Sequence, residues 1–314
     1  MSESQGWESM AERGSVMLLR FAVWFRLSLG RSLTALILYP TVAYFFLTSR
    51  TVRRASHEYL GRLFALHGPA PGLSGPPRWW HSFLHILSFS ENTLDRFCFW
   101  AGRYDQFDVK FDGREHLMRH VNADHGAILL GAHLGSFDAL RVLASAHDIV
   151  VNVVMFTANA RQINEVFKSL DPESDLRVIE IDPTSVRSAF EVKRCLDRGE
   201  FVAILGDRTG FGGRDRVAKA DFFGQAARFP QSPFLLSVIT RAPVLFTVAL
   251  RTAPFQYHVI AEPFWEGGAV PPGERAKVVQ ECVERYASFL ERHCAQAPMQ
   301  WFNFYDFWAE GEHV

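Results

Sequence analysis

From about residue 107 to residue 293, short apolar runs alternate with longer segments whose apolar residues recur at helical spacing. A short apolar run bounded by turn residues is typical of a strand that is buried on both faces of a sheet. The predicted strands are Phe107–Phe111, Ala127–Gly131, Ile149–Phe156, Arg177–Ile181, Phe201–Leu205, Val244–Leu250 and Tyr257–Glu262. The predicted helices are Glu115–Asn122, Ser136–Ala146, Arg161–Ser169, Ser185–Arg198, Ser232–Thr240 and Glu274–His293. This alternation predicts an α/β fold around a mixed, mainly parallel sheet that is flanked by helices.

The chain before residue 107 has a different pattern, which predicts helices without strands. Residues 51–66 and 79–101 have helical spacing, and Gly68–Pro77 between them is rich in proline and glycine, which predicts a surface loop. We therefore expect three regions. They are a membrane-associated helical region over residues 1–66, a loop and aromatic helix over residues 67–106, and an α/β catalytic domain over residues 107–314.

The first of these regions contains an apolar run, Ser32–Thr48, that has no charged residue over 17 positions. About 17 residues is the lower limit for a helix that crosses a bilayer, and Pro40 near the middle would kink it. Upstream, Met17–Leu29 mixes apolar residues with arginines, as in a helix that lies in the membrane interface. The pattern predicts an N-terminal helical membrane anchor. The alternative is a buried helical hairpin of a soluble domain.

A secretory signal peptide fits this region poorly. The apolar run starts late, lies between basic clusters and lacks a small-x-small cleavage site after it. Because arginines flank both ends of the run, charge does not predict an orientation across the membrane.

Charge and composition narrow the possible partners. The net charge of −1 gives no overall field that favours nucleic acid. Seven arginines and no acidic residue lie between Arg13 and Arg54, as expected beside an anionic membrane surface. The 28 phenylalanines suit a large core or a wall that meets lipid. The four cysteines lack C-x-x-C spacing, which argues against a zinc knuckle and a disulfide framework and favours a reducing compartment.

The candidate chemistry begins at His133, which follows the strand Ala127–Gly131, and Asp138 lies five residues further on. On one continuous helix, side chains five residues apart diverge by roughly 140°. They can meet if His133 lies in a turn before a helix and Asp138 in its first turn, with Gly135 forming the turn and Ser136 capping the helix. The pattern therefore places the pair at a strand-to-helix junction, where open α/β sheets often hold their active sites.

A carboxylate on one imidazole nitrogen fixes the histidine tautomer and leaves the other nitrogen able to take a proton from a hydroxyl. We therefore predict that His133 is a general base and that Asp138 orients it. The chain has no G-x-S-x-G segment, which disfavours an acyl-enzyme formed on serine.

Two other patterns are weaker. A metal site from His116, His120 and His125 with Asp124 lacks any familiar ligand spacing. The glycine-rich stretch Gly206–Gly213 is not followed by the lysine of a nucleotide-binding loop. The aromatic stretch Trp301–Trp308 is expected to pack over the core, with binding of lipid or of a partner as alternatives.

The segment around His133 and Asp138 resembles the H-x₄-D/E motif of the glycerolipid and lipid A acyltransferase superfamily, and in particular the bacterial lipid A late acyltransferase branch. Other segments match that branch in the same order over roughly residues 7–306. They are Trp7, Glu12-Arg13-Gly14, Leu38-Tyr39-Pro40, Arg53–Leu60, Met155-Phe156 with Asn159, Gly206-Asp207-Arg208, Asp221-Phe222-Phe223-Gly224, and Phe229-Pro230 with Pro233.

This resemblance implies a membrane-associated acyltransferase. Such an enzyme moves a fatty acyl group from an acyl carrier protein or acyl-coenzyme A thioester to a hydroxyl or amine of a lipid or glycolipid acceptor. It implies no cofactor and no metal, and it implies a catalytic domain that faces the cytoplasm from the inner membrane.

The resemblance also suggests which residues bind the substrates. Asp207 and Arg208 follow the strand Phe201–Leu205 and are expected either to line the same cleft as His133 or to form a structural ion pair. The remaining candidates are two polar residues of the second block and three phenylalanines that line an acyl tunnel or simply fill the core. They are Asn159, Arg161, Phe222, Phe223 and Phe229.

The chain departs from the branch at two places. Thr157 stands where the branch often has an arginine, and Arg161 four residues on is the candidate to replace it. The pair Asp207-Arg208 stands where the branch more often has Asp-Gln or Asp-Glu. These departures leave open a non-catalytic lipid-binding membrane protein. An acyl-thioester hydrolase on the same fold, which would use the same pair with water, is the other alternative.

Overall fold

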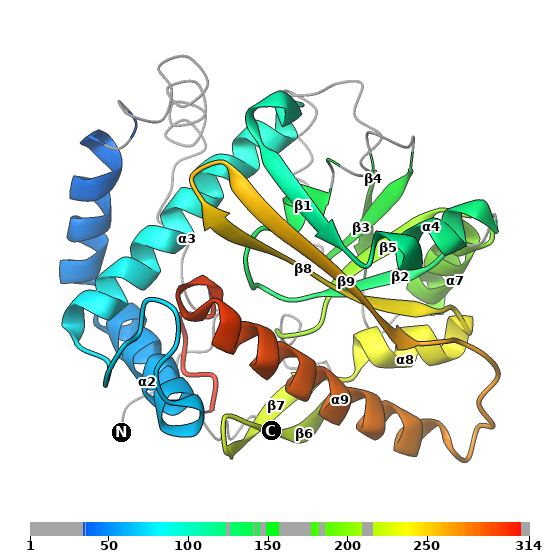
Figure 1. The fold of residues 1–314 in the computed structure, drawn as a ribbon. Coiled ribbons are helices and arrows are strands. Elements are labelled where there is room, and N and C mark those ends of the chain that lie inside the picture. Colours follow the sequence, from blue (N-terminus) through cyan, green and yellow to red (C-terminus); the bar gives the residue numbers. More distant parts are fainter. Residues whose placement is uncertain are drawn as a thin grey trace.

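The computed structural model describes residues 34, 36–123, 126–140, 142, 144, 149–156, 177–181, 186–208 and 216–308. Its centre is a seven-stranded sheet in the order β1-β9-β8-β2-β5-β3-β4 (Figure 1). The strands are β1 (Asp108–Asp112), β2 (Ile128–Gly131), β3 (Val151–Phe156), β4 (Arg177–Ile181), β5 (Phe201–Leu205), β8 (Val244–Ala253) and β9 (Gln256–Trp265).

Five neighbouring strands, β8, β2, β5, β3 and β4, run parallel. Strand β9 pairs antiparallel with β8, and β1 pairs parallel with β9. The predicted mixed, mainly parallel sheet is therefore confirmed. The helices labelled in Figure 1 are α2 (Arg50–His67), α3 (Trp79–Trp100), α4 (Arg114–Asn122), α7 (Val186–Leu196), α8 (Ser232–Thr240) and α9 (Arg275–Gln296).

Most predicted elements that fall within the described residues lie within a few residues of their observed bounds. The predicted helices Met17–Leu29 and Arg161–Ser169 lie outside the described residues. One predicted element differs, and one hairpin is additional. The segment predicted as the helix Ser136–Ala146 opens as a short 3-10 helix, η3 (Phe137–Ala139). A hairpin of β6 (Val217–Phe222) and β7 (Gln225–Pro230) was not predicted. The strands mix alanine with charged residues and so lack an apolar run. They are joined by Phe223 and Gly224, both at positive φ, as a two-residue hairpin turn requires.

The main core joins the middle of the sheet to α9, α2 and the chain after α9. Tyr59, Leu60 and Leu63 of α2 are buried in the same cluster as Tyr286 of α9. Trp301 and Trp308 are buried there too, so the C-terminal aromatic stretch packs over the core as expected. The predicted region boundaries at residues 66 and 106 stay a prediction.

Residues 36–48 form a helix that packs on α3. Val42 is buried against Ile86 and Leu87 of α3, and Phe46 contacts the Phe83 ring at 5.7 Å between centroids. Within the described part of the chain, none of the helices combines the length and the apolar character needed to span a bilayer. The predicted anchor is therefore not confirmed as a membrane-spanning segment.

Candidate active site

His133 and Asp207 occupy matching positions at the ends of two neighbouring strands. In the parallel pair of β2 and β5, Gly131 aligns with Leu205. Each of the two functional side chains lies two residues beyond its strand. Because parallel strands end at the same edge of the sheet, pairing brings together residues that are 74 positions apart in the chain.

The turn after β2 is held tightly against β8 and against the chain after α9. A Cβ atom at Gly135, whose φ is +68°, would lie 2.0 Å from the carbonyl oxygen of Ala249, so glycine is required there. The Ser136 N–H donates to the same carbonyl at 2.8 Å, and the Phe302 N–H donates to the His133 carbonyl at 2.7 Å. These bonds fix the backbone on both sides of the imidazole.

Asp207 is the carboxylate that holds His133. Its Oδ1 atom lies 2.8 Å from His133 Nδ1, and its Oδ2 atom accepts the His133 backbone N–H at 2.9 Å. Oδ2 also accepts from Trp301 Nε1 at 3.1 Å and from Asn303 Nδ2 at 2.8 Å. The Asp207 side chain is fully buried, so four donors replace the water that the carboxylate loses.

The charges around the imidazole keep it neutral and keep Asp207 ionised. Burial lowers the pKa of His133, the positive charge of Arg208 lowers it further, Asp207 opposes both, and Arg96 adds a smaller lowering effect. Burial would raise the pKa of Asp207. The attraction and hydrogen bonds of His133, together with Arg208, outweigh burial and hold that pKa at about 2.

Since an ionised carboxylate can only accept, Nδ1 of His133 carries the proton and Nε2 carries the lone pair. The His133 side chain is 24% exposed, so a substrate can reach it. The arrangement provides an oriented general base at neutral pH.

Asp138 binds other partners than the one we expected. Its Oδ2 atom accepts from Arg96 Nε at 2.8 Å, and its Oδ1 atom accepts from Trp100 Nε1 at 2.6 Å. Within the described residues no hydrogen bond joins Asp138 to His133. We predicted that Asp138 would orient His133. In the structure the carboxylate on His133 Nδ1 is Asp207 instead.

Arg208 lies beside this pair as the sequence indicated. Its Nε atom donates to Asn303 Oδ1 at 2.7 Å, and its Nη2 atom donates to the Phe302 carbonyl at 2.8 Å. Asn303 therefore bridges Arg208 and Asp207. Asp207 and Arg208 thus lie beside His133, and the charge of Arg208 acts on the imidazole. Their predicted role in lining a substrate cleft stays a prediction.

The other predicted site residues fall into two groups. Asn159, Arg161 and Thr157 lie outside the described residues. Three phenylalanines, Phe222, Phe223 and Phe229, are buried in the main core.

Phe222 packs against Trp301 at 5.2 Å between ring centroids, which connects this aromatic cluster to the tryptophan that binds Asp207. The role of these phenylalanines in lining an acyl tunnel stays a prediction.

Sequence reasoning missed four residues that build the site: Arg96, Trp100, Trp301 and Asn303. The spacing of Arg96 and Trp100, four residues apart on a predicted helix, shows that they share a face but not what they face. The predicted cap was also wrong, because Ser136 makes no side-chain cap hydrogen bond and its buried Oγ atom has no partner among the described residues.

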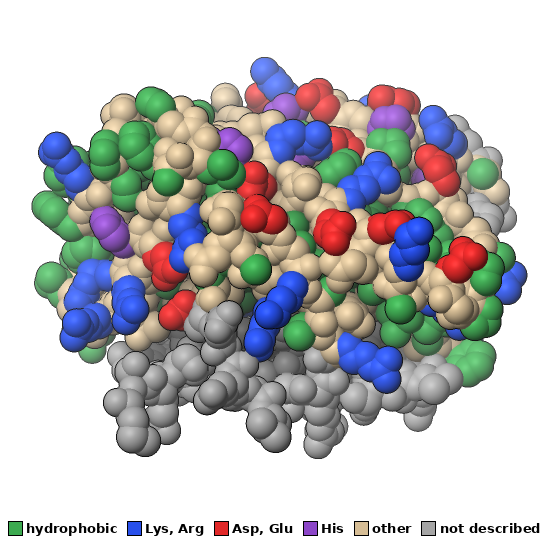
Figure 2. Space-filling view, turned by 90° about the horizontal axis from the view of Figure 1, so that it is seen from below, with side chains coloured by type: hydrophobic (Ala, Val, Ile, Leu, Met, Phe, Trp, Pro, Cys, Tyr) green, Lys and Arg blue, Asp and Glu red, His purple; other side chains and the backbone are tan. Residues whose placement is uncertain are grey.

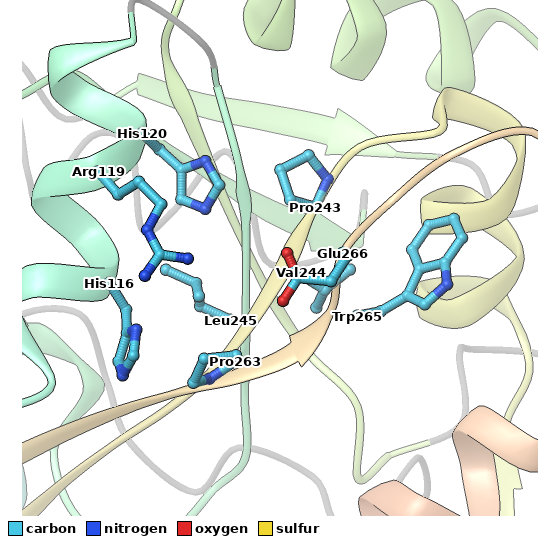
Figure 3. A pocket seen from close by; sticks show the side chains of 9 residues that line it. All are labelled: His116, Arg119, His120, Pro243, Val244, Leu245, Pro263, Trp265 and Glu266. Atoms are coloured by element: carbon cyan, nitrogen blue, oxygen red, sulfur yellow. The ribbon is translucent and has the colours of Figure 1, made fainter.

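A separate hollow lies at the opposite edge of the sheet, between α4 and the ends of β8 and β9 (Figure 3). His116, Arg119 and His120 line it from α4, and the Glu266 carboxylate points toward them from across the hollow. The described residues include no group of three or more His, Cys, Asp or Glu side chains placed to hold a metal ion.

Comparison with known proteins connects this geometry to an activity. Residues 92–309 match the family model of the bacterial lipid A biosynthesis acyltransferases, and this range includes His133, Asp138 and Asp207. No curated protein matches the chain. Because the family match covers more than half of the chain, the protein is an acyltransferase that belongs to the bacterial lipid A biosynthesis acyltransferase family.

Proposed function

We propose that this protein transfers a fatty acyl group from an acyl carrier protein or acyl-coenzyme A thioester to a hydroxyl or amine of a lipid or glycolipid acceptor. The observation that best supports the proposal is the 2.8 Å contact between His133 Nδ1 and Asp207, which leaves Nε2 as an oriented base on an accessible side chain.

In the proposed reaction, His133 Nε2 takes the proton of the acceptor hydroxyl while the acceptor oxygen bonds to the thioester carbonyl carbon. The carbonyl oxygen becomes an oxyanion. When the intermediate collapses, the carbon–sulfur bond breaks, and the departing thiolate takes the proton from the His133 imidazolium. Asp207 stabilises that imidazolium through Nδ1. The products are the acylated lipid and the free thiol of the carrier, and His133 is neutral again.

The test is an assay of the purified full-length protein with a labelled acyl thioester and a lipid A precursor in vesicles. We expect the label in the acylated lipid, with release of one thiol for each acyl group transferred. Label in free fatty acid without acylated lipid would instead identify a thioester hydrolase. Lipid binding without any thiol release would identify a non-catalytic protein.

We further propose that the enzyme works at the inner membrane, with its catalytic domain in the cytoplasm. The support comes from exposed apolar side chains that concentrate on the helix over residues 36–48 and on α3. The most exposed are Leu36, Ile37, Tyr39, Tyr44, Leu47, Trp79 and Leu84. Figure 2 shows hydrophobic and basic side chains together at the left end of the molecule, where Figure 1 places α2 and α3.

This surface suits an anionic bilayer because apolar side chains lie beside arginines. Arg50 at the start of α2 is exposed, and the Arg78 guanidinium lies over Trp80 at 4.8 Å from the ring centroid. Burial of the apolar side chains and attraction of the arginines to acidic lipid head groups both favour membrane binding of such a surface. All four cysteines are free, which is compatible with a reducing compartment.

Changing both Leu36 and Leu47 to serine is expected to weaken binding to vesicles that contain phosphatidylglycerol by at least about tenfold. The reason is that burying one leucine side chain contributes roughly 1.5–3 kcal/mol of binding free energy. Co-sedimentation with the vesicles measures it. The matched control is Phe190→Ser, since Phe190 of α7 is 65% exposed but lies outside this surface. Equal loss in both variants, or no loss in the double variant, would contradict membrane docking here.

A further inference from the structure

Asp138 holds Arg96 in a defined position. Arg96 and Trp100 are one turn apart on α3, and both donate to the Asp138 carboxylate, at 2.8 and 2.6 Å. The Arg96 guanidinium also lies 5.9 Å from the centroid of the Trp100 ring. The Asp138 side chain is 16% exposed. A carboxylate with two donors and little contact with water is a fixed anchor for the arginine.

The helix that carries Arg96 is itself clamped to the sheet. Arg251 of β8 pairs with Glu91 of α3 at 2.5 Å, and the hydroxyl of Tyr257 in β9 donates to Asp95 at 2.9 Å. These contacts come from the turn of α3 just before Arg96. The position of the guanidinium is therefore set from two sides, by α3 and by Asp138.

The guanidinium of Arg96 keeps donors that Asp138 does not use. Asp138 bonds to Nε of Arg96, and among the described residues no hydrogen bond occupies its two Nη groups. The Arg96 side chain is 43% exposed, and its bond to Asp138 holds it against the turn after β2 that also carries His133. Two parallel Nη donors form a fork that fits an anionic oxygen pair or a single oxyanion.

We propose that Arg96 binds an anionic oxygen of the substrates at His133, and that Asp138 is a positioning residue that acts through Arg96. This inference rests on the proposed acyl transfer. The anionic oxygen is either the oxyanion of the tetrahedral intermediate or a phosphate oxygen of the donor or acceptor. Asp138 therefore positions the arginine that binds the anionic oxygen, whereas Asp207 orients the base His133.

A double-mutant cycle on transfer kinetics tests the inference. Arg96→Ala is expected to lower kcat/KM by about 10- to 100-fold, the loss typical of a charged hydrogen bond. Asp138→Asn alone is expected to cause a smaller loss. In the Arg96→Ala background the same change is expected to cost less than about twofold, since two positions in one interaction are strongly non-additive.

The form of the loss identifies the anion. A fall in kcat at unchanged KM indicates the oxyanion of the intermediate, and a rise in KM for the donor or the acceptor indicates a phosphate on that substrate. Arg96→Lys keeps the charge but not the fork, and we expect it to recover part of the activity. Loss of the Arg96 charge should also raise the pKa of His133 and move the acid limb of the kcat/KM profile to higher pH.

Arg198 and Glu200 provide the matched control. They form an ion pair at 2.7 Å with 45% and 10% side-chain exposure, but they precede β5 and lie at the opposite edge of the sheet from Asp207. Arg198→Ala is expected to leave transfer kinetics unchanged. Far-UV circular dichroism and thermal unfolding check that each variant folds, and Arg96→Gln replaces Arg96→Ala if the alanine variant does not.

Two outcomes would overturn the inference. One is an Asp138→Asn cost that is as large in the Arg96→Ala background as in the wild type, since Asp138 would then act without Arg96. The other is wild-type kinetics in Arg96→Ala. If the wild type transfers acyl groups and the His133→Ala variant does not, the proposed function stands and only the role of Arg96 fails.

Discussion

Replacing His133 by alanine is expected to lower kcat for acyl transfer by about 10²–10⁴-fold, the usual contribution of a positioned general base. The fold should survive, since the His133 side chain is partly exposed and its loss leaves no large cavity. Asp207 would keep three of its four donors, including the His133 backbone N–H. Initial rates with a labelled thioester measure the effect.

The matched control is His258→Ala, because His258 also contacts an aspartate, Asp112, at 2.7 Å and is 32% exposed, but lies on β9, which β8 separates from β2 in the sheet. As the pH is lowered, kcat/KM of the wild type should begin to fall only below pH 6.5. The reason is that burial and nearby arginines lower the pKa of His133. A folded His133→Ala variant with full activity would rule out the proposed base.

Replacing Asp207 by asparagine is expected to lower kcat by up to about 10⁴-fold. An amide has one acceptor oxygen and one NH₂ group, whereas both oxygens of Asp207 accept hydrogen bonds. If the NH₂ group faces Nδ1, it forces the proton of His133 onto Nε2, which can then no longer act as a base. If the NH₂ group faces the other way, it meets the donors of His133 N, Trp301 and Asn303.

Single-turnover rates together with thermal unfolding separate the loss of chemistry from the loss of stability in this variant. Asp112→Asn is the matched control on the exposed His258 pair and should be nearly silent. Retention of more than about a tenth of the wild-type rate would contradict the role of Asp207, because a wrong tautomer cannot support that rate.

We also expect the buried Asp207 carboxylate to make the stability of the fold depend on pH. Its pKa in the folded protein is about 2, below the ordinary value of 3.8, so its ionised form stabilises the fold fully above about pH 4. That contribution, on the order of 2 kcal/mol, is lost as the pH falls toward 2. The free energy of unfolding of Asp207→Asn, measured by urea titration between pH 4 and 2, should therefore vary less with pH than that of the wild type.

The two aspartates illustrate why the site was only partly predictable. The spacing of His133 and Asp138 was visible in the sequence, and the structure does place His133 in the turn after β2. Spacing alone could not tell which partner each carboxylate binds. Asp138 turns to Arg96, which lies 42 residues earlier on a helix whose direction depends on its packing against β8 and β9. The sequence around Asp138 therefore does not predict its contact with Arg96.

By itself, the sequence determined the order and type of most elements, the mainly parallel sheet, and a histidine at a strand end, because these follow from apolar periodicity and turn residues within short segments. Only the tertiary structure decided that Asp207 is the carboxylate on His133. That contact depends on the pairing of β2 with β5, and it is completed by Trp301 and Asn303, which lie 94 and 96 positions beyond Asp207. Contacts at such separations arise when elements pack, so the contacts of the candidate site could not be read from motif spacing.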